Sequence, residues 1–262
     1  MRLYLRLLYI FYKNNLIGEL EYRLNFWSST FLSLFWLLWG ALTVQIYFVH
    51  AKSIAGWSYN EILVVVGMFF LMNGLRQAFI APNLGDLSDH VRLGTLDYVL
   101  LRPVNSQFMV SWRRLNVYAC VQPLLGGGLI GYALWQLHRM PDVGRLLLFL
   151  VLTAAAFAIL YSMTFILQTT TVWLVGLRRA DTVVLSAIEA GRFPIDFYRG
   201  WVRTALTTIV PVAFLTTFPS EALLGRLDGA FAIPTVAVAV VLCALASIYW
   251  RAALRRYTGA SS

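Results

Sequence analysis

The side chains that most often carry out chemistry are few in this sequence and lie far apart. Its only lysines are Lys13 and Lys52. A P-loop holds nucleotide phosphates with a glycine-rich turn that ends in a lysine. Tyr12 precedes Lys13 and Ala51 precedes Lys52, so neither can serve as that lysine. The sequence therefore predicts no ATPase site and no cofactor bound by this chain.

Nucleophilic and metal-binding patterns are also missing from the sequence. Cys120 and Cys243 both lie in apolar runs and are too far apart for a metal-site spacing, so we interpret them as small apolar side chains. The sequence contains no H-E-x-x-H pair, no C-x-x-C pair and no recognisable Ser/His/Asp set. We therefore predict a protein that is not an enzyme, with no catalytic and no metal-binding residues.

Ion-coupled carriers usually need an acidic or histidine side chain inside the bilayer. The twelve acidic residues here fall in loops or at the ends of apolar runs, and the three histidines also lie outside those runs. An ion-coupled secondary carrier is thus disfavoured, but it remains an alternative, as does a non-transporting membrane anchor or assembly subunit. Arg76 is the one formal charge inside a run, and we expect its long side chain to reach the interface.

The elements that carry these residues are predicted from composition. The chain is 60% hydrophobic and 13% charged, with a mean hydropathy of +0.70, whereas soluble domains carry about 25% charged residues. Continuous apolar runs near the roughly 20 residues that cross a bilayer predict an all-α integral membrane protein rather than a β-barrel. We expect one transmembrane domain over residues 1–262, with six spans at about 24–49, 60–80, 112–137, 146–176, 203–219 and 230–250.

The charge distribution predicts the orientation of these spans. Most of the 21 basic residues precede the first span, flank the second and fourth connections or follow the sixth span. Positive loops stay cytoplasmic, so both termini and residues 178–203 are expected there. Residues 178–203 could touch a partner, bind anionic lipid or shield a lateral opening. Because topology explains the net charge of +9, nucleic acid is not an expected partner.

The first 21 residues are too charged to span the membrane. Leu3, Leu7 and Ile10 lie near one helical face, while Arg6 and Lys13 lie elsewhere. This pattern predicts an amphipathic helix in the interface, in contact with membrane lipids. A polar extension of the first span is the alternative.

Residues 82–106 form a polar, turn-rich insert between the second and third spans. Leu84, Leu87 and Val91 recur at helical spacing, and Gly94 should end that helix. Thr95 is expected to cap a second short helix, with Asp97 near its start complementing the helix dipole. Such a pair of helices could dock on a soluble partner by shape and charge. A solvated connector is the bland alternative.

The third span contains a proline and a group of glycines. Pro123 is expected to kink it, while Gly126-Gly127-Gly128 and Gly131 could form a hinge or let another helix pack closely; we favour packing.

These motifs resemble those of a known family. Gly94-Thr95-Leu96-Asp97, Leu100 and Arg102-Pro103 look like the G-x-L-D-x-x-L-x-R-P cytoplasmic signature of type-2 ATP-binding-cassette (ABC) permeases, in the single-domain six-span branch. Further matches are Phe193-Pro194 with Tyr198, Pro211-x-x-Phe214, Phe218-Pro219 and Leu224-Gly225.

The resemblance implies a function and a set of partners. It implies a permease subunit of an exporter in a bacterial-type inner (cytoplasmic) membrane, paired with a second copy or a homologous permease. Separate cytoplasmic ABC ATPase subunits, which carry ATP and Mg, would bind the coupling segment 82–106. Residues implied in coupling are Asp86, Asp89, Arg92, Gly94, Thr95, Asp97, Arg102 and Pro103. Possible gating or packing residues are Pro123, Gly127, Gly131, Pro211, Phe214 and Pro219, the last three beside a re-entrant hairpin.

Overall fold

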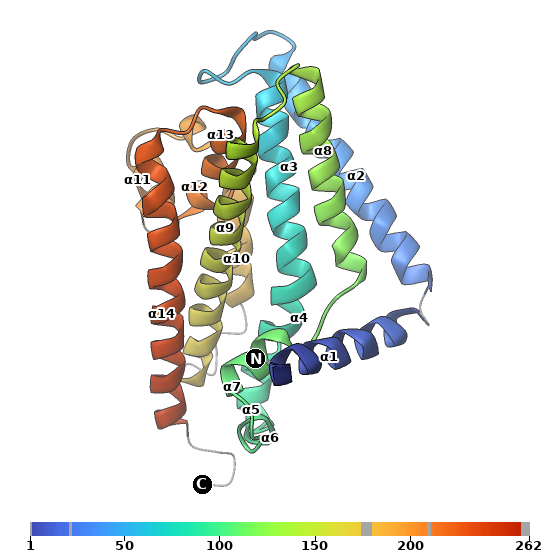
Figure 1. Ribbon diagram of the computed structural model, residues 1–262, viewed down its shortest axis with the longest axis vertical. Helices are drawn as coiled ribbons and strands as arrows, with labels where there is room; N and C mark the ends of the chain where they lie inside the picture. The colour runs from blue at the N-terminus through green and yellow to red at the C-terminus, as the bar shows by residue number, and fades with distance from the viewer. Residues whose placement is uncertain (1, 21–22, 174–179, 209–210, 258–262) are drawn as a thin grey trace.

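The computed structural model describes residues 2–20, 23–173, 180–208 and 211–257. All the named elements in these ranges are helices (Figure 1). The long helices are α1 (Arg2–Leu20), α2 (Arg23–Phe48), α3 (Tyr59–Leu75), α8 (Val121–Gln136), α9 (Val143–Thr169) and α14 (Ala232–Arg256). Between them lie η1 (Arg76–Ile80), α4 (Ala81–Leu84), α5 (Leu87–Arg92), α6 (Leu96–Leu100), α7 (Ser106–Trp112), η2 (Tyr118–Cys120) and η3 (Thr170–Val172). The C-terminal third adds α10 (Ala180–Ala190), η4 (Ile195–Phe197), α11 (Gly200–Thr208), α12 (Val212–Leu215), α13 (Thr217–Leu224) and η5 (Gly229–Phe231).

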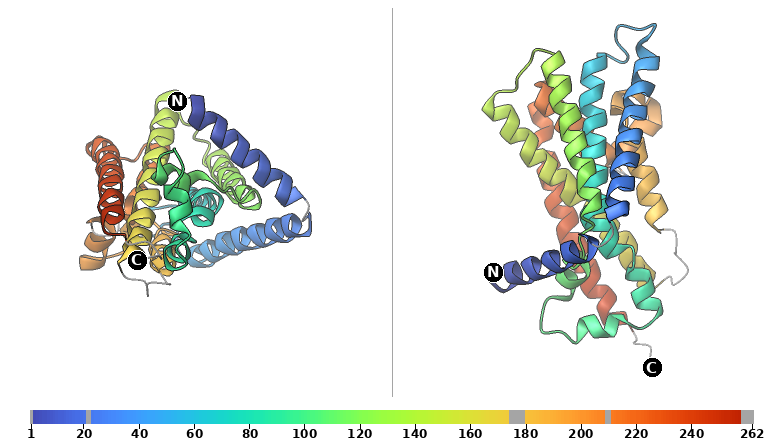
Figure 2. Two further views of the ribbon diagram at one scale, coloured as in Figure 1. Left: turned by 90° about the horizontal axis from the view of Figure 1, so that it is seen from below. Right: turned by 90° about the vertical axis from the view of Figure 1, so that its right-hand side faces the viewer.

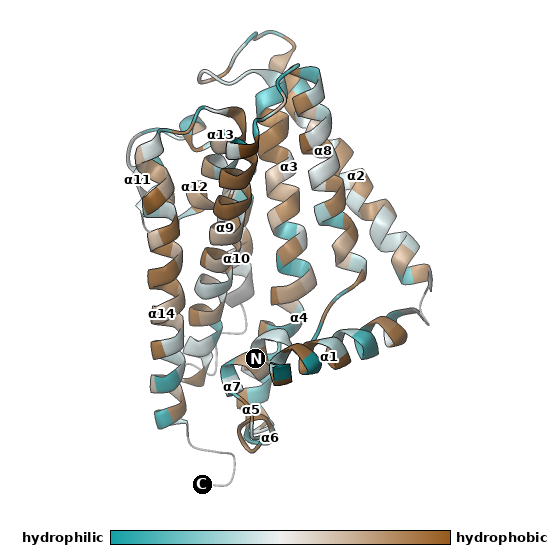
Figure 3. Ribbon diagram, in the orientation of Figure 1, coloured by the Kyte–Doolittle hydropathy of each residue, from teal (hydrophilic) through white to brown (hydrophobic). Residues whose placement is uncertain are grey.

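Four segments are long and apolar enough to cross a membrane: Leu24–Phe48, Tyr59–Arg92, Val143–Val172 and Gly229–Arg256. They correspond to the expected first, second, fourth and sixth spans. Hydrophobic residues dominate these helices, and hydrophilic residues gather toward their ends (Figure 3). The structure therefore supports an all-helical membrane protein.

The expected third and fifth spans differ from the structure. The third was predicted to begin near residue 112, but α7 ends at Trp112 and α8 begins at Val121. Pro123 lies in the first turn of α8, where its missing N–H costs nothing, so it kinks no long helix. The fifth, predicted over 203–219, is divided into α11, α12 and α13, with Pro211 at the N-terminal boundary of α12.

Helix α3 lies at the centre of the bundle, and apolar side chains cover it on all sides. Every residue from Ile62 to Phe70 is buried, as expected for a helix covered on all sides. Glu61, in the first turn of α3, stabilises the start of the helix. Its carboxylate accepts hydrogen bonds from the Ser58 backbone N–H at 2.9 Å and from the Ser58 hydroxyl at 3.0 Å, which is one half of a capping box.

Helices α3 and α8 pack backbone against backbone. A Cβ added to Gly67 would lie 2.8 Å from the carbonyl oxygen of Gly126, and one added to Gly126 would lie 2.6 Å from that of Gly67. Farther along, Gly74 leaves room for the ring of Pro123. Small residues allow this close approach between membrane helices.

Helix α1 lies across the end of the bundle that also carries α5 and α6 (Figures 1 and 2). It is a single helix over nearly the whole predicted range, and Leu3, Leu5 and Ile17 are exposed on it. Asn15 fixes it to the core by donating to the Arg113 carbonyl oxygen at 3.2 Å. The prediction of an amphipathic helix at an angle to the spans is thus consistent with the structure.

Candidate functional site

The coupling segment forms two short helices, α5 and α6, at the end of the bundle (Figure 1). Gly94 adopts a φ of 68° between them, a left-handed conformation that glycine takes without strain. Leu84, Leu87 and Leu96 are fully buried and anchor the segment. The break at Gly94 was therefore predicted from the sequence.

Polar residues in and just before α5 make two ion pairs. Arg92 pairs with Asp89 at 3.1 Å within the helix, and Asp86 pairs with Arg114 just beyond α7. Both pairs are about half exposed, so each contributes little to stability. The Asp86 contact fixes the position of the segment relative to the 113–117 connection.

Thr95 occupies the N-cap position of α6 but makes no capping bond. Its hydroxyl instead lies 2.7 Å from Nδ1 of His90, so it ties α6 to α5. Asp97 lies in the first turn of α6, as expected, and near Tyr257 at the C-terminal end. Burial, followed by the Asp97 carboxylate, raises the pKa of Tyr257. Arg102 and Pro103 follow α6 and are exposed.

Three large apolar side chains on this segment were not identified from the sequence. Leu93 is 62% exposed, Tyr98 71% and Leu101 81%. Leu84, Leu87 and Leu96 face the core, whereas these three lie on other faces of the short helices. Their helical spacing relative to the buried leucines could have predicted from the sequence that they are exposed. These three side chains lie within residues 93–101, and apolar side chains that gather on a surface are common at protein-binding sites.

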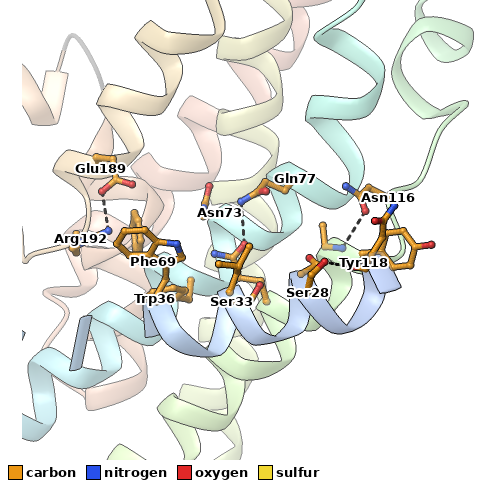
Figure 4. Close-up of a pocket in the computed structure, with 16 residues that line it drawn as sticks. Ser28, Ser33, Trp36, Phe69, Asn73, Gln77, Asn116, Tyr118, Glu189 and Arg192 are labelled. Carbon is orange, nitrogen blue, oxygen red and sulfur yellow. Dashed lines mark hydrogen bonds and ion pairs between the residues drawn. The ribbon is translucent and has the colours of Figure 1, made fainter. Parts of the chain in front are cut away.

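A polar groove of about 660 Å³ lies between α2 and α3 (Figure 4). Asn25, Ser28 and Ser33 contribute from one face of α2, Asn73 from α3 and Gln77 from η1. Such a concentration of amide and hydroxyl groups between spans is costly in lipid, so it indicates a hydrated path or a binding site.

An ion pair lies at one end of this groove. Arg192 pairs with Glu189 of α10 at 3.1 Å, and its guanidinium lies 5.0 Å from the ring centre of Phe69. Phe69 lies about ten residues into α3, roughly 15 Å from its start at 1.5 Å per residue. Glu189 lies at the C-terminal end of α10, and its ion pair with Arg192 places it beside this inner part of α3.

Arg76 also differs from its expected position. Its side chain is 4% exposed and lies at the start of the π-helical turn η1, so it does not reach out to solvent. π-Helical turns often mark functional positions within helices. Beside it, Gln77 donates to Gln122 of α8 at 3.1 Å and joins the groove to the α3–α8 pair.

The far end of the bundle closes around the loop between α2 and α3. The buried Trp57 donates from Nε1 to Asp196 at 2.9 Å, and Arg203 pairs with Asp196 at 2.8 Å. The sequence-based orientation placed Arg203 with the coupling segment, but it lies at the opposite end. The prediction from charge distribution was wrong for Arg203 because α10 runs back toward this end of the bundle (Figure 2).

Arg226 completes this closure. It pairs with Glu61 at 2.9 Å and stacks over the Trp57 ring at 4.4 Å. Burial, together with the Asp196 carboxylate, raises the pKa of Glu221 to about 7, although Arg226 and Arg203 oppose the shift.

The predicted gating and packing residues divide into two groups. Phe214 and Pro219 are buried in α12 and α13, Phe214 stacks edge-on against Phe218, and Pro211 precedes α12. Gly127 and Gly131 have nothing within 4 Å of an added Cβ. The packing role expected of the glycine group is therefore seen at Gly126 but not at Gly127 or Gly131.

Helices long and apolar enough to cross a membrane define a multi-pass membrane protein. Residues 34–261 match the family described as ABC-2 family transporter protein. Since the match covers most of the chain, the protein belongs to this family: it is a permease component of an ABC transporter. Neither the curated proteins nor the solved structures include a significant match. Family membership implies association with an ABC ATPase, and it indicates no enzymatic activity of the chain itself.

Proposed function

We propose that this chain is the permease of an exporter in a bacterial-type inner membrane, with both termini in the cytoplasm. Six crossings would be made by α2, α3, α8, α9, α14 and, as the fifth, α10 together with the chain that follows it to Asp196, because α10 itself has only 11 residues. Helices α11–α13 would form a re-entrant cap on the outer side. The position of the coupling segment, at the same end as α1 and the end of α14, supports this orientation (Figure 1).

The observation that carries the proposal is the exposed surface of the coupling segment. Leu93, Tyr98 and Leu101 project apolar groups that nothing in the described chain covers. An ATPase subunit carrying ATP and Mg would bury them, with Asp89, Arg92 and Arg102 supplying polar contacts. ATP binding would then move α5 and α6 and, through η1 and α4, helix α3.

The groove supports export from the cytoplasmic side. Its residues Asn25, Asn116 and Tyr118 lie near the coupling end, and Arg192 lies at its inner limit. A second copy or a homologous permease would face the groove and complete the path. Glu189 and Arg192 would provide paired charges for a polar group of the cargo.

The docking surface can be tested by co-purification. Tagged wild-type protein and Tyr98→Ala/Leu101→Ala are isolated in mild detergent from cells that also express the candidate ATPase. Each substitution removes a large apolar contact, so the double variant should recover at least tenfold less ATPase. Met140→Ala is the matched control, since Met140 is 75% exposed at the opposite end. Equal ATPase recovery by all three proteins would refute docking through this segment.

A further inference from the structure

Three arginines gather around a second groove, at the end of the bundle where α1 lies. Arg102, Arg113 and Arg114 line it together with one face of α1, which contributes Ile10 and Phe11. Its volume is about 520 Å³. The groove is distinct from the polar groove between α2 and α3 because none of its lining residues is shared.

The positive charge in this groove is only partly compensated. Arg114 pairs with Asp86, but no carboxylate of the described residues lies within ion-pair distance of Arg102 or Arg113. Glu19 also lines the groove, yet its carboxylate accepts the backbone N–H of Val117 at 2.8 Å. Partial burial, followed by the charges of Arg102 and Arg114, lowers the pKa of Arg113. An anion in the groove would relieve this repulsion.

The surroundings favour a lipid as the source of that anion. Helix α1 exposes Leu3, Ile10 and Ile17 along one face, the pattern of a helix that lies in the interface of a bilayer. The groove joins this apolar surface to the arginines. Ile10 and Phe11 could contact acyl chains while the arginines hold a phosphate, whereas a free phosphate would make no use of them.

We propose that this groove binds the phosphate of an anionic phospholipid from the inner leaflet. Arg102 and Arg113 supply the main charge, and Arg114 keeps its bond to Asp86. Because Arg102 follows α6 in the coupling segment, a bound lipid would link the segment to α1. The site thereby makes the position of the coupling segment sensitive to the anionic lipid content of the membrane.

The test compares lipid retention by the full-length protein. It is purified from nanodiscs that contain equal amounts of phosphatidylglycerol and phosphatidylcholine with identical acyl chains, and bound lipid is counted by native mass spectrometry. Wild type should retain phosphatidylglycerol in preference. Since each arginine near a membrane surface contributes about fivefold in affinity, Arg102→Gln/Arg113→Gln should weaken retention about 30-fold.

A charge-matched control separates this site from general attraction. Lys52→Gln/Arg139→Gln also removes two exposed positive charges, at the far end of the bundle, and should retain lipid as wild type does. Similar loss in the control, unchanged retention in Arg102→Gln/Arg113→Gln, or equal retention of phosphatidylcholine would each overturn the proposal. Displacement by glycerol phosphate at the same concentration as the lipid would overturn it as well, because a free anion would then be the ligand.

Discussion

Helix α3 packs tightly against one neighbour, α8, and loosely against the other, α2. Against α8 it packs through Gly67, Gly126 and Gly74, with backbones in direct contact. Against α2 it leaves a polar groove of about 660 Å³. In the most apolar part of each helix, 72% of the residues of the α3 segment are buried, but only 17% of those of α2.

This difference divides the chain into a rigid pair of helices, α3 and α8, and a helix, α2, whose packing within the chain is incomplete. The α3–α8 pair has no room to slide without backbone collision, so it should move as one body. Helix α2 exposes large apolar side chains and lines the groove with polar ones, so its surroundings must include lipid and a further surface. Motion of the coupling segment would thus shift the α3–α8 pair relative to α2.

The largest effect is expected from filling the tight contact. Gly67→Ala and Gly126→Ala place a methyl group within 2.8 Å of backbone atoms, and overpacking of this kind costs about 1–3 kcal/mol. Gly67→Leu should abolish the folded protein, as measured by detergent-resistant monodisperse yield.

Two control substitutions test whether α2 and α8 differ in how tightly they pack. A Cβ on Gly40 of α2 would lie 3.4 Å from the Phe70 side chain, an ordinary contact, and one on Gly127 would meet nothing within 4 Å. Gly40→Ala and Gly127→Leu should therefore preserve yield. If Gly40→Ala were as damaging as Gly67→Ala, the asymmetry between α2 and α8 would be wrong.

The hydration of the groove can be measured by cysteine labelling. In a variant without Cys120 and Cys243, Ser33→Cys places a thiol in the groove, and Leu34→Cys places one at nearly the same depth but about 100° around α2, outside the groove lining. A water-soluble maleimide should modify Ser33→Cys on the order of tenfold faster, because thiolates form readily only in water. Equal rates would show that the groove is closed to water.

Transmission from the coupling segment to the groove gives a smaller effect. Asp97→Ala should lower transport several-fold relative to ATP hydrolysis, while membrane insertion and ATPase recovery stay unchanged. The reason is that Asp97 complements the start of α6 and lies near Tyr257. The measurement is the ratio of transport to hydrolysis in reconstituted vesicles, and Asp142→Asn at the far end serves as control. An unaltered ratio would remove Asp97 from coupling.

The smallest effect concerns pH at the far end of α3. The pKa of Glu221 is raised to about 7, mainly by burial. A carboxyl group with a raised pKa binds more protons in the folded than in the unfolded state, so stability should fall as pH rises from about 4.5 to 7. Glu221→Gln should flatten the melting temperature over this range. An identical slope in wild type and Glu221→Gln would show that other groups cause it.

Much of the secondary structure was predictable because its signals are local. Continuous apolar runs marked α2, α3, α9 and α14, and Gly94 marked the turn between α5 and α6. The structure has three short helices, α11, α12 and α13, where one fifth span was predicted, because Thr204–Ser220 is apolar enough to imitate a single long helix. Apolar composition does not distinguish a helix that crosses the membrane from helices that fold back within the protein.

The sequence by itself indicated a helical membrane protein and predicted no nucleotide site, because composition and the order of short motifs are properties of the chain alone. Only the tertiary structure decided which side chains face one another. Successive helical residues point about 100° apart, so Gly126 packs on α3 while Gly127 faces away. In the same way, Glu189 and Arg192 come to the groove and Arg203 to the far end because of the rotation and direction of their helices, which depend on contacts far apart in the sequence.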